Sequence, residues 1–367
     1  MDFTYTSEQE SLRDSVRRFV EREYGWEERF RIIRSADGVA PGHWATFAEL
    51  GWLGAGLSEE AGGFGGGAIE NALIAEELGR ALVTEPFNAH VMATQLLAAL
   101  PVDTASDLTA AIVMGEQRII PALQEPAGRG DWRQVEARAI GTALTGTKSL
   151  VEGAMSADRL IVSARSKDGI ALYLVDPHAE GVTLSPYRTL DNRRVADIHF
   201  ADAPVTLLAN GAVAETAIET AIDHGLLTLC GEALGIMDTA LWATRDYLKV
   251  RKQFGTALGN FQALQHRMAD MLIETEMTRS ILLSALGAME GDDPLPRTAA
   301  VSAAKVQAST GGLFVASQAI QLHGGIGVTE ELNISHHYRR LYVIARQLGD
   351  VDLHLARFAD ATDQAAA

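Results

Sequence analysis

The chain has 367 residues, more than one hydrophobic core usually holds, so its length predicts two or three packed domains. Its formal net charge of −17 argues against a nucleic-acid-binding protein, because phosphate binding needs a positive surface. Cys230 is the only cysteine, which excludes a disulfide within the chain, and its apolar surroundings predict a buried side chain.

The first residues carry neither the basic nor the apolar region of a signal peptide. A continuous apolar run of 18 residues, long enough to span a membrane, is not found in the sequence. We therefore expect a cytoplasmic protein without membrane insertion.

The N-terminal part of the chain, residues 1–115, is predicted to be a helical domain. Ser7 and Glu10 fit a capping box at the start of its first helix. Apolar residues then recur at helical spacing, namely Leu12, Val16, Phe19 and Val20. Two further periodic runs predict helices over 69–82 and 89–100.

A glycine cluster, residues 62–67, precedes the second of these helices. A phosphate cradle would require a Lys-Ser or Lys-Thr pair after the glycines and a strand before them, and neither is evident. We interpret the cluster as a loop between helices.

The middle of the chain, residues 116–208, changes to the pattern of β-strands. Turn signals such as Asp168-Gly169 and Glu180-Gly181 separate its apolar runs. The predicted strands cover 118–120, 148–151, 159–163, 170–175 and 195–200. We expect a compact β-domain here.

Long apolar-periodic helices return in residues 209–367, over 213–248, 262–289, 298–322 and 351–361. Prolines in the segment 292–296 separate two of them. The pattern predicts an antiparallel four-helix bundle. Small residues in 298–322 would permit close packing within the bundle or against another subunit.

Two motifs in this last part have the residue types of a dinucleotide site. One runs Arg251-Lys252-Gln253-Phe254-Gly255 and is followed by Gln262; the other is Gln321-Leu322-His323-Gly324-Gly325. An arginine offers fixed donors to a pyrophosphate, and paired glycines let the backbone approach a cofactor closely.

The order of these motifs resembles the C-terminal half of the acyl-CoA dehydrogenase family, and Gly51-Trp52-Leu53-Gly54 and Glu76-Glu77-Leu78-Gly79 resemble its N-terminal part. The resemblance implies a mostly α fold with a central β-barrel-like domain between an N-terminal helical domain and a C-terminal four-helix bundle. It also implies FAD as cofactor, an acyl-CoA substrate and an electron-transfer flavoprotein as acceptor. The implied FAD contacts are Arg251, Phe254, Phe261, Gln262, Gln321, Gly324 and Gly325. For Phe254 and Phe261 a place in the core is the alternative.

The β-domain departs from the family pattern at four positions. Gln124 and Arg129 stand where the family has hydroxyl residues near the flavin or the thioester. Leu150 stands where a tryptophan shields the flavin ring, and Glu152 where a threonine bonds it. The resemblance therefore does not decide whether this chain forms the flavin-facing half of its own site.

The catalytic base of the family is also replaced. Removal of the substrate's α-proton, with transfer of the β-hydride to the flavin, needs a carboxylate close to the α-carbon. Leu348 occupies the position of the usual glutamate, and the family's other location falls near Gly225. Among the nearby acids, Asp350 is our candidate for the base. An N-cap role before the last helix is its alternative.

His336 and His337, with Lys249 and Arg251, suggest a basic mouth for CoA phosphates. A solvated charged face is the alternative. The spacing of the histidines does not match that of metal ligands, so we expect no metal site.

Together these departures resemble the small subunit of pimeloyl-CoA dehydrogenase-type enzymes, which are heteromers acting on bulky or dicarboxylic acyl-CoA thioesters, including steroid side chains. This implies α,β-dehydrogenation by a heteromer with a second acyl-CoA dehydrogenase subunit, with a homo-oligomer as the alternative. Two other functions remain open: a non-catalytic partner subunit that holds the adenosine half of FAD, and a flavin monooxygenase or oxidase on the same fold.

Overall fold

A computed structural model of the protein describes residues 4–291 and 293–366. The chain packs as two compact units, each drawn from distant parts of the sequence. The first unit takes residues up to 29, 72–83 and those from 226 onward, and the second takes 30–71 and 84–225. Because this division follows packing and not chain order, the three consecutive domains 1–115, 116–208 and 209–367 stay a prediction.

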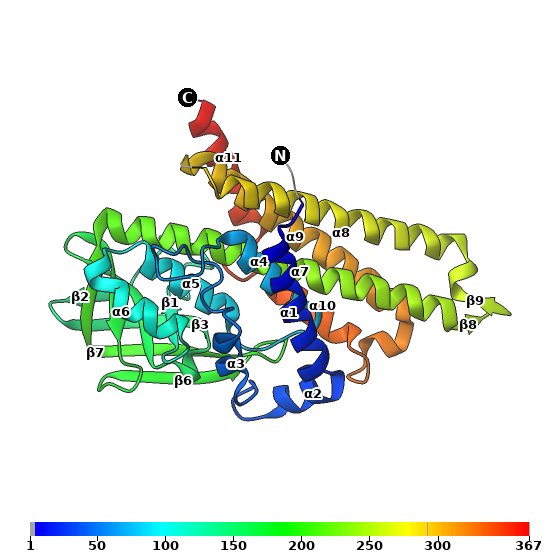
Figure 1. Cartoon of the computed structure of the whole chain (residues 1–367), viewed down its shortest axis with the longest axis horizontal. Helices are drawn as coiled ribbons and strands as arrows, with labels where there is room; N and C mark the ends of the chain where they lie inside the picture. Colours follow the sequence, from blue (N-terminus) through cyan, green and yellow to red (C-terminus); the bar gives the residue numbers. More distant parts are fainter. Residues whose placement is uncertain (1–3, 292, 367) are drawn as a thin grey trace. The chain divides into compact units, whose positions relative to one another are not determined.

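The second unit is built around one sheet. Its strands are β1 (Ile119–Ala122), β2 (Arg138–Ile140), β3 (Ala143–Glu152), β4 (Arg159–Ser166), β5 (Gly169–Val175), β6 (Val182–Arg188) and β7 (Arg194–Asn210). Strands β4, β2, β3, β7 and β5 pair in that order, and β5 pairs back onto β4. Strands β6 and β7 lie side by side in Figure 1. Closure leaves few open edges and encloses fully buried side chains such as Leu160, Ile198 and Phe200. The β-barrel-like middle part is therefore confirmed.

Helices of the second unit include α3 (His43–Glu49), α5 (Phe87–Ala98) and α6 (Val102–Val113). In α5 every residue from Phe87 to Leu97 is buried, including the polar Asn88, His90, Thr94 and Gln95. This helix contacts β1 and α6. The glycine cluster lies in the loop between α3 and α4 (Ala68–Arg80), which confirms its interpretation as a loop.

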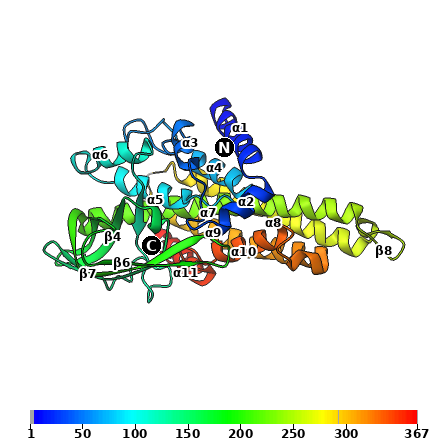
Figure 2. The same cartoon turned by 90° about the horizontal axis from the view of Figure 1, so that it is seen from below.

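The first unit is helical. It contains α1 (Ser7–Glu23), the start of α2 (Trp26–Arg34), most of α4, the second part of α7 (Gly211–Val250), α8 (Gln262–Ala288), α9 (Pro294–His323), α10 (Ile334–Ile344) and α11 (Val351–Ala366). Helix α9 packs against α8, α10 and α11, and Figure 2 shows α8 and α9 side by side. The small residues of α9 permit this approach, because a Cβ on Gly312 would lie 3.1 Å from Leu341. Both helical parts and the central sheet agree with the expected fold class.

The capping box at the start of α1 differs by one residue from the sequence prediction. Thr6, not Ser7, is the N-cap of α1: its hydroxyl accepts the amide of Gln9, whose side chain accepts the amide of Thr6 in return. At α9 the carboxylate of Asp293 accepts the amide of Leu295 at 3.0 Å. The other end of the predicted break, Asp292, lies outside the described residues.

One described helix, α7, is long and apolar enough to cross a membrane by composition, with a mean hydropathy of 1.3 over its best window. Of that window, 78% is buried within the protein, as in the core helix of a globular fold. Cys230 lies in this helix and is fully buried, as predicted.

Candidate functional site

In the first unit, the end of α7 just before the Arg251 motif contacts the second motif at His323. The ring of Tyr247, near the end of α7, stacks on the ring of His323 at the end of α9, with centroids 4.4 Å apart. The Tyr247 hydroxyl donates to the carbonyl of His323 at 3.3 Å. Burial lowers the pKa of His323, so at neutral pH its Nδ1–H donates to the carbonyl of Ala319. The fold thus brings together segments that are far apart in the sequence.

The Arg251 motif forms a small hairpin. Strands β8 (Lys252–Gln253) and β9 (Thr256–Ala257) pair across a turn in which Phe254 has a φ of 53°. Phe254 is 90% exposed, which rules out its alternative place in the core. Its ring meets the half-buried ring of Phe261 edge to face at 6.2 Å. The hairpin therefore presents an aromatic pair to the outside of the unit.

The second motif ends in the short helix η3 (Gly324–Val328). Gln321, Gly324 and Gly325 are exposed, and a Cβ on either glycine would meet nothing within 4 Å. Gly324 has a φ of 66°, which glycine adopts without strain. The backbone here is open to a ligand.

These residues fit the adenosine and pyrophosphate part of a dinucleotide. The side chains of Arg251, Gln262 and Gln321 are exposed and make no hydrogen bond or ion pair within the described part of the chain. A free guanidinium and two free amides can donate to phosphate and ring acceptors. All seven residues predicted to contact FAD belong to this one unit.

The position of the missing base is occupied by a buried side chain. Leu348 is 6% exposed and has a φ of 58° in the turn between α10 and α11. The turn is held from two sides: Nζ of Lys305 donates to the carbonyl of Ile344, and Nε2 of His354 lies 3.0 Å from the carbonyl of Leu348. Burial lowers the pKa of His354 to about 4, so the neutral ring donates through Nε2. Position 348 therefore offers an apolar side chain in place of a carboxylate.

Asp350 acts as a helix cap in the structure. Its Oδ1 accepts the amide of Leu353 at 3.0 Å at the start of α11, and its side chain is exposed. Glu232 is another acidic residue of the first unit. Both its carboxylate oxygens accept hydrogen bonds from the buried guanidinium of Arg340, at 2.7 and 2.6 Å, so this carboxylate is already paired. The role of Asp350 as a base stays a prediction.

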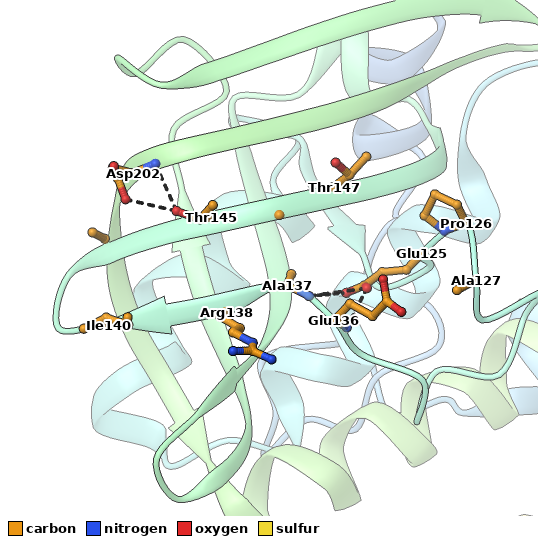
Figure 3. Close-up of a pocket in the computed structure, with 12 residues that line it drawn as sticks. Glu125, Pro126, Ala127, Glu136, Ala137, Arg138, Ile140, Thr145, Thr147 and Asp202 are labelled. Atoms are coloured by element: carbon orange, nitrogen blue, oxygen red, sulfur yellow. Dashed lines mark hydrogen bonds between the residues drawn. The ribbon is translucent and has the colours of Figure 1, made fainter.

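In the second unit, a buried ion pair holds the strand end that was expected to face the flavin. Nζ of Lys148 lies 2.6 Å from Oε1 of Glu125, and both side chains are buried. Glu125 also accepts the amides of Glu136 and Ala137 (Figure 3). Burial lowers the pKa of Lys148 to about 8, although Glu125 opposes this shift. A cavity of about 730 Å³ lies beside the pair, lined by the loop after β1, strands β2 and β3, and Asp202.

Strand β3 is irregular at the position where the family has its tryptophan. The pairing of β3 with β7 shifts between Lys148 and Val151, and Leu150 there has a φ of 56° and is 53% exposed. Oδ1 of Asp197 accepts both the amide of Leu150 and the hydroxyl of Tyr187, at 3.1 and 2.8 Å. An unusual backbone held by a carboxylate is typical of a functional segment.

At the next predicted flavin-facing position, Glu152 makes an ion pair with the buried guanidinium of Arg193, with Nη1 and Oε1 2.5 Å apart. The pairs Glu125–Lys148, Asp197–Tyr187 and Glu152–Arg193 were missed in the sequence. Their partners are separated by 10 or more positions, so local spacing offers no signal for them.

The prediction that His336 and His337 form part of a basic mouth for CoA phosphates is wrong, because both side chains are buried. His336 and His337 are 2% and 1% exposed. Burial, with repulsion from Arg29, lowers their pKa values to about 4 and about 3, so both are neutral at physiological pH. Nη1 of Arg29 donates to Nδ1 of His336 at 3.1 Å. Within the described residues there is also no group of three or more histidine, cysteine or acidic side chains placed to hold a metal ion.

Comparison with known proteins agrees with this arrangement. The family description "Acyl-CoA dehydrogenase, N-terminal domain" matches residues 6–106, and "Acyl-CoA dehydrogenase, C-terminal domain" matches residues 215–361. The protein named probable acyl-CoA dehydrogenase YngJ, from Bacillus subtilis, is 30% identical over 92% of this chain and 93% of its own length.

Two solved structures are similar over nearly the whole chain. A variant of the Tcur3481-Tcur3483 steroid ACAD has a TM-score of 0.90 at 31% identity, covering 98% of each chain. The ChsE4-ChsE5 complex from Mycobacterium tuberculosis has a TM-score of 0.89 at 25% identity, covering 99% of each chain. With both terminal domains matched and a relative of this identity aligned over almost its full length, the chain belongs to the acyl-CoA dehydrogenase family.

Proposed function

We propose that this chain is a subunit of an FAD-dependent enzyme that removes the α and β hydrogens of an acyl-CoA thioester. The observation that carries the proposal is that the Arg251 and Gln321 motifs both have exposed side chains in one unit, with Tyr247, just before the first motif, stacked on His323 of the second. A guanidinium binds a pyrophosphate with two parallel hydrogen bonds, and exposed glycines allow close approach to the backbone. FAD, when bound, would take up the hydride from the β-carbon.

In this proposal each residue of the exposed surface has a role toward the cofactor. Arg251 would neutralise the pyrophosphate, while the amides of Gln262 and Gln321 would donate to it or to the adenosine. Gly324 and Gly325 would leave room for the ligand, since a side chain there would occupy it. Phe254 and Phe261 would cover the apolar face of the dinucleotide.

We further propose that the enzyme is a heteromer with a second acyl-CoA dehydrogenase subunit. An aromatic side chain that is 90% exposed on a hairpin favours a covering partner. Each of the two similar structures is named for a pair of chains, one of them explicitly as a complex. Because Leu348 cannot take a proton, the partner would supply the carboxylate that removes the α-proton. An electron-transfer flavoprotein in the cytoplasm would be the acceptor.

A second candidate is a non-catalytic partner subunit that only holds the adenosine half of FAD. The ion pair of Glu152 with Arg193 favours it, because this carboxylate is already engaged where the family has a threonine. Asp350 as the base would argue for an active chain instead. The flavin oxidase or monooxygenase remains the third candidate, and oxygen consumption without an added acceptor would distinguish it.

The test is to measure flavin content and molecular mass for the protein made alone and together with a genomically adjacent dehydrogenase. One flavin per heterodimer, bleached by an acyl-CoA, is the expected result. A yellow homo-oligomer bleached by an acyl-CoA would replace the heteromer with a self-sufficient enzyme. Protein without flavin in both preparations would refute the assignment of FAD.

A further inference from the structure

The cavity beside β2 and β3 in the second unit contains both a cationic and an anionic side chain. Its volume of about 730 Å³ is within the range of small-molecule pockets. The residues predicted to contact FAD all belong to the first unit, and the proposed function assigns no role to this cavity. Its lining therefore has to be explained by another ligand.

Side chains along β2 and the two residues before it alternate between the protein interior and the cavity. Ala137 and Ala139 are buried, whereas Glu136, Arg138 and Ile140 are exposed and line the cavity. This is the two-residue period of an extended chain. Figure 3 shows the three exposed residues in a row along this segment. A carboxylate, a guanidinium and an apolar side chain therefore face the same space.

The two opposite charges of this row are not used within the described part of the chain. There, the side chains of Glu136 and Arg138 make no hydrogen bond and no ion pair, either with each other or with another residue. The other acids that line the cavity are engaged. Glu125 belongs to the buried ion pair, and Asp202 accepts the hydroxyl of Thr145 at 3.0 Å. Among the charged groups of the lining, Glu136 and Arg138 are thus available to a ligand.

The charge balance of the lining decides which kind of ligand suits the cavity. A purely anionic ligand bound to Arg138 would lie close to the carboxylates of Glu136 and Asp202. A purely cationic ligand bound to Glu136 would lie close to the guanidinium. Like charges repel, so a neighbouring group opposes each of these ligands. A ligand that carries both charges can meet each side chain with the opposite sign.

The cavity also offers an apolar contact. Ile140 is 83% exposed, and Pro126, Ala127 and Ala143 line the same space. An apolar group of the ligand that covers this surface removes it from water, which is favourable. The lining thus combines two charges of opposite sign with an uncovered apolar surface.

We propose that this cavity binds a small zwitterion with an apolar side chain, that is, an apolar α-amino acid. Arg138 binds its carboxylate with two parallel hydrogen bonds, and Glu136 accepts hydrogen bonds from its ammonium group. Ile140 packs against its side chain. The site does not depend on FAD or on an acyl-CoA thioester, because all of its contacts come from the second unit.

The test uses three ligands with the same apolar group. Leucine carries both charges, isocaproate lacks the ammonium group, and isoamylamine lacks the carboxylate. Their binding to the full-length protein is measured by calorimetry at neutral pH and low salt. We expect leucine to bind roughly tenfold or more tightly than either of the other two, because each of them lacks one hydrogen-bonded charge.

Variants of the two charged residues test the assigned contacts. Arg138→Gln and Glu136→Gln should each weaken leucine binding roughly tenfold to hundredfold, the range for a lost hydrogen bond to a charged group. Arg138→Lys should restore part of the loss, because it keeps the charge. Since both side chains are exposed, these variants should unfold at the denaturant concentration of the native chain. Arg133→Gln is the matched control, because it removes an exposed arginine that is paired with Asp131 outside the cavity.

The inference is overturned if leucine at millimolar concentration does not bind the native chain, or if both glutamine variants bind it as the native chain does. Equal binding of leucine and isocaproate would assign the cavity to an anion, and equal binding of leucine and isoamylamine would assign it to a cation. Either result would also overturn the inference. Flavin content, measured on the same samples, reports separately on the proposed function.

Discussion

Replacing Lys148 with methionine tests whether the buried ion pair holds the strand end in the second unit. Lys148→Met keeps most of the side-chain volume but leaves the carboxylate of Glu125 without its counter-ion. Breaking a buried pair by removing one partner costs about 3 to 5 kcal/mol. Glu125 keeps the amides of Glu136 and Ala137, at 2.6 and 3.2 Å. We therefore expect a loss of about 3 kcal/mol, the lower end of that range.

Denaturant unfolding of the native chain and the variant, followed by tryptophan fluorescence, measures this loss. The double change Glu125→Gln with Lys148→Met should cost less than Lys148→Met alone, because it leaves no buried charge. Arg133→Met, which breaks an exposed pair with Asp131, should cost at most about 0.5 kcal/mol. If Lys148→Met unfolds at the same denaturant concentration as the native chain, the pair does not stabilise the fold and the reasoning is refuted.

Three further predictions concern the cofactor surface, the candidate base and acid stability. Arg251→Ala should lower the flavin retained after purification, since it removes a charge-assisted contact to the pyrophosphate, whereas Lys252→Ala should not; equal flavin in all three proteins would contradict the assignment. Asp350→Asn should keep both fold and turnover if the residue is only a cap, because asparagine caps helices as well, while Asp350→Ala should cost about 1 kcal/mol; a large loss of turnover in Asp350→Asn would make it the base. His90 and His337 are buried with pKa values lowered to about 4 and about 3, so only the unfolded state takes up their protons below pH 6.5. Stability should therefore fall by about 1.4 kcal/mol per pH unit for each histidine as the pH drops from 6.5 toward 4, and a flat urea midpoint between pH 6.5 and 5 would exclude this.

Apolar periodicity was sufficient to predict the long helices. The predicted range 262–289 corresponds to α8 (Gln262–Ala288), and 213–248 to α7 (Gly211–Val250). Such patterns depend on neighbours within one or two turns, which the sequence contains directly. Shorter elements escaped: α10 (Ile334–Ile344), β2 (Arg138–Ile140) and β6 (Val182–Arg188) were not predicted. An element of a few turns or residues is stabilised mainly by what it packs against.

The family motifs were also readable from the sequence, since they are short runs of adjacent residues such as Arg251-Lys252-Gln253-Phe254-Gly255. The sequence did not indicate which of their side chains are exposed. Phe254 is an aromatic residue of a type often found in the core, but it lies on the surface. His336 and His337 are polar residues of a type often found on the surface, but both are buried. Burial is decided by segments distant in the chain, as when Arg29 reaches His336.

The sequence by itself therefore determined the helical periods, the β-rich middle and the identity of the cofactor motifs, because each is a property of adjacent residues. The tertiary structure alone decided which side chains are available for chemistry. In the folded chain, Glu152 forms an ion pair with Arg193, whereas Arg118 has no ion-pair partner among the described residues. The physical reason is that charge and burial depend on three-dimensional neighbours, and folding brings those neighbours from strands and helices that local patterns do not connect.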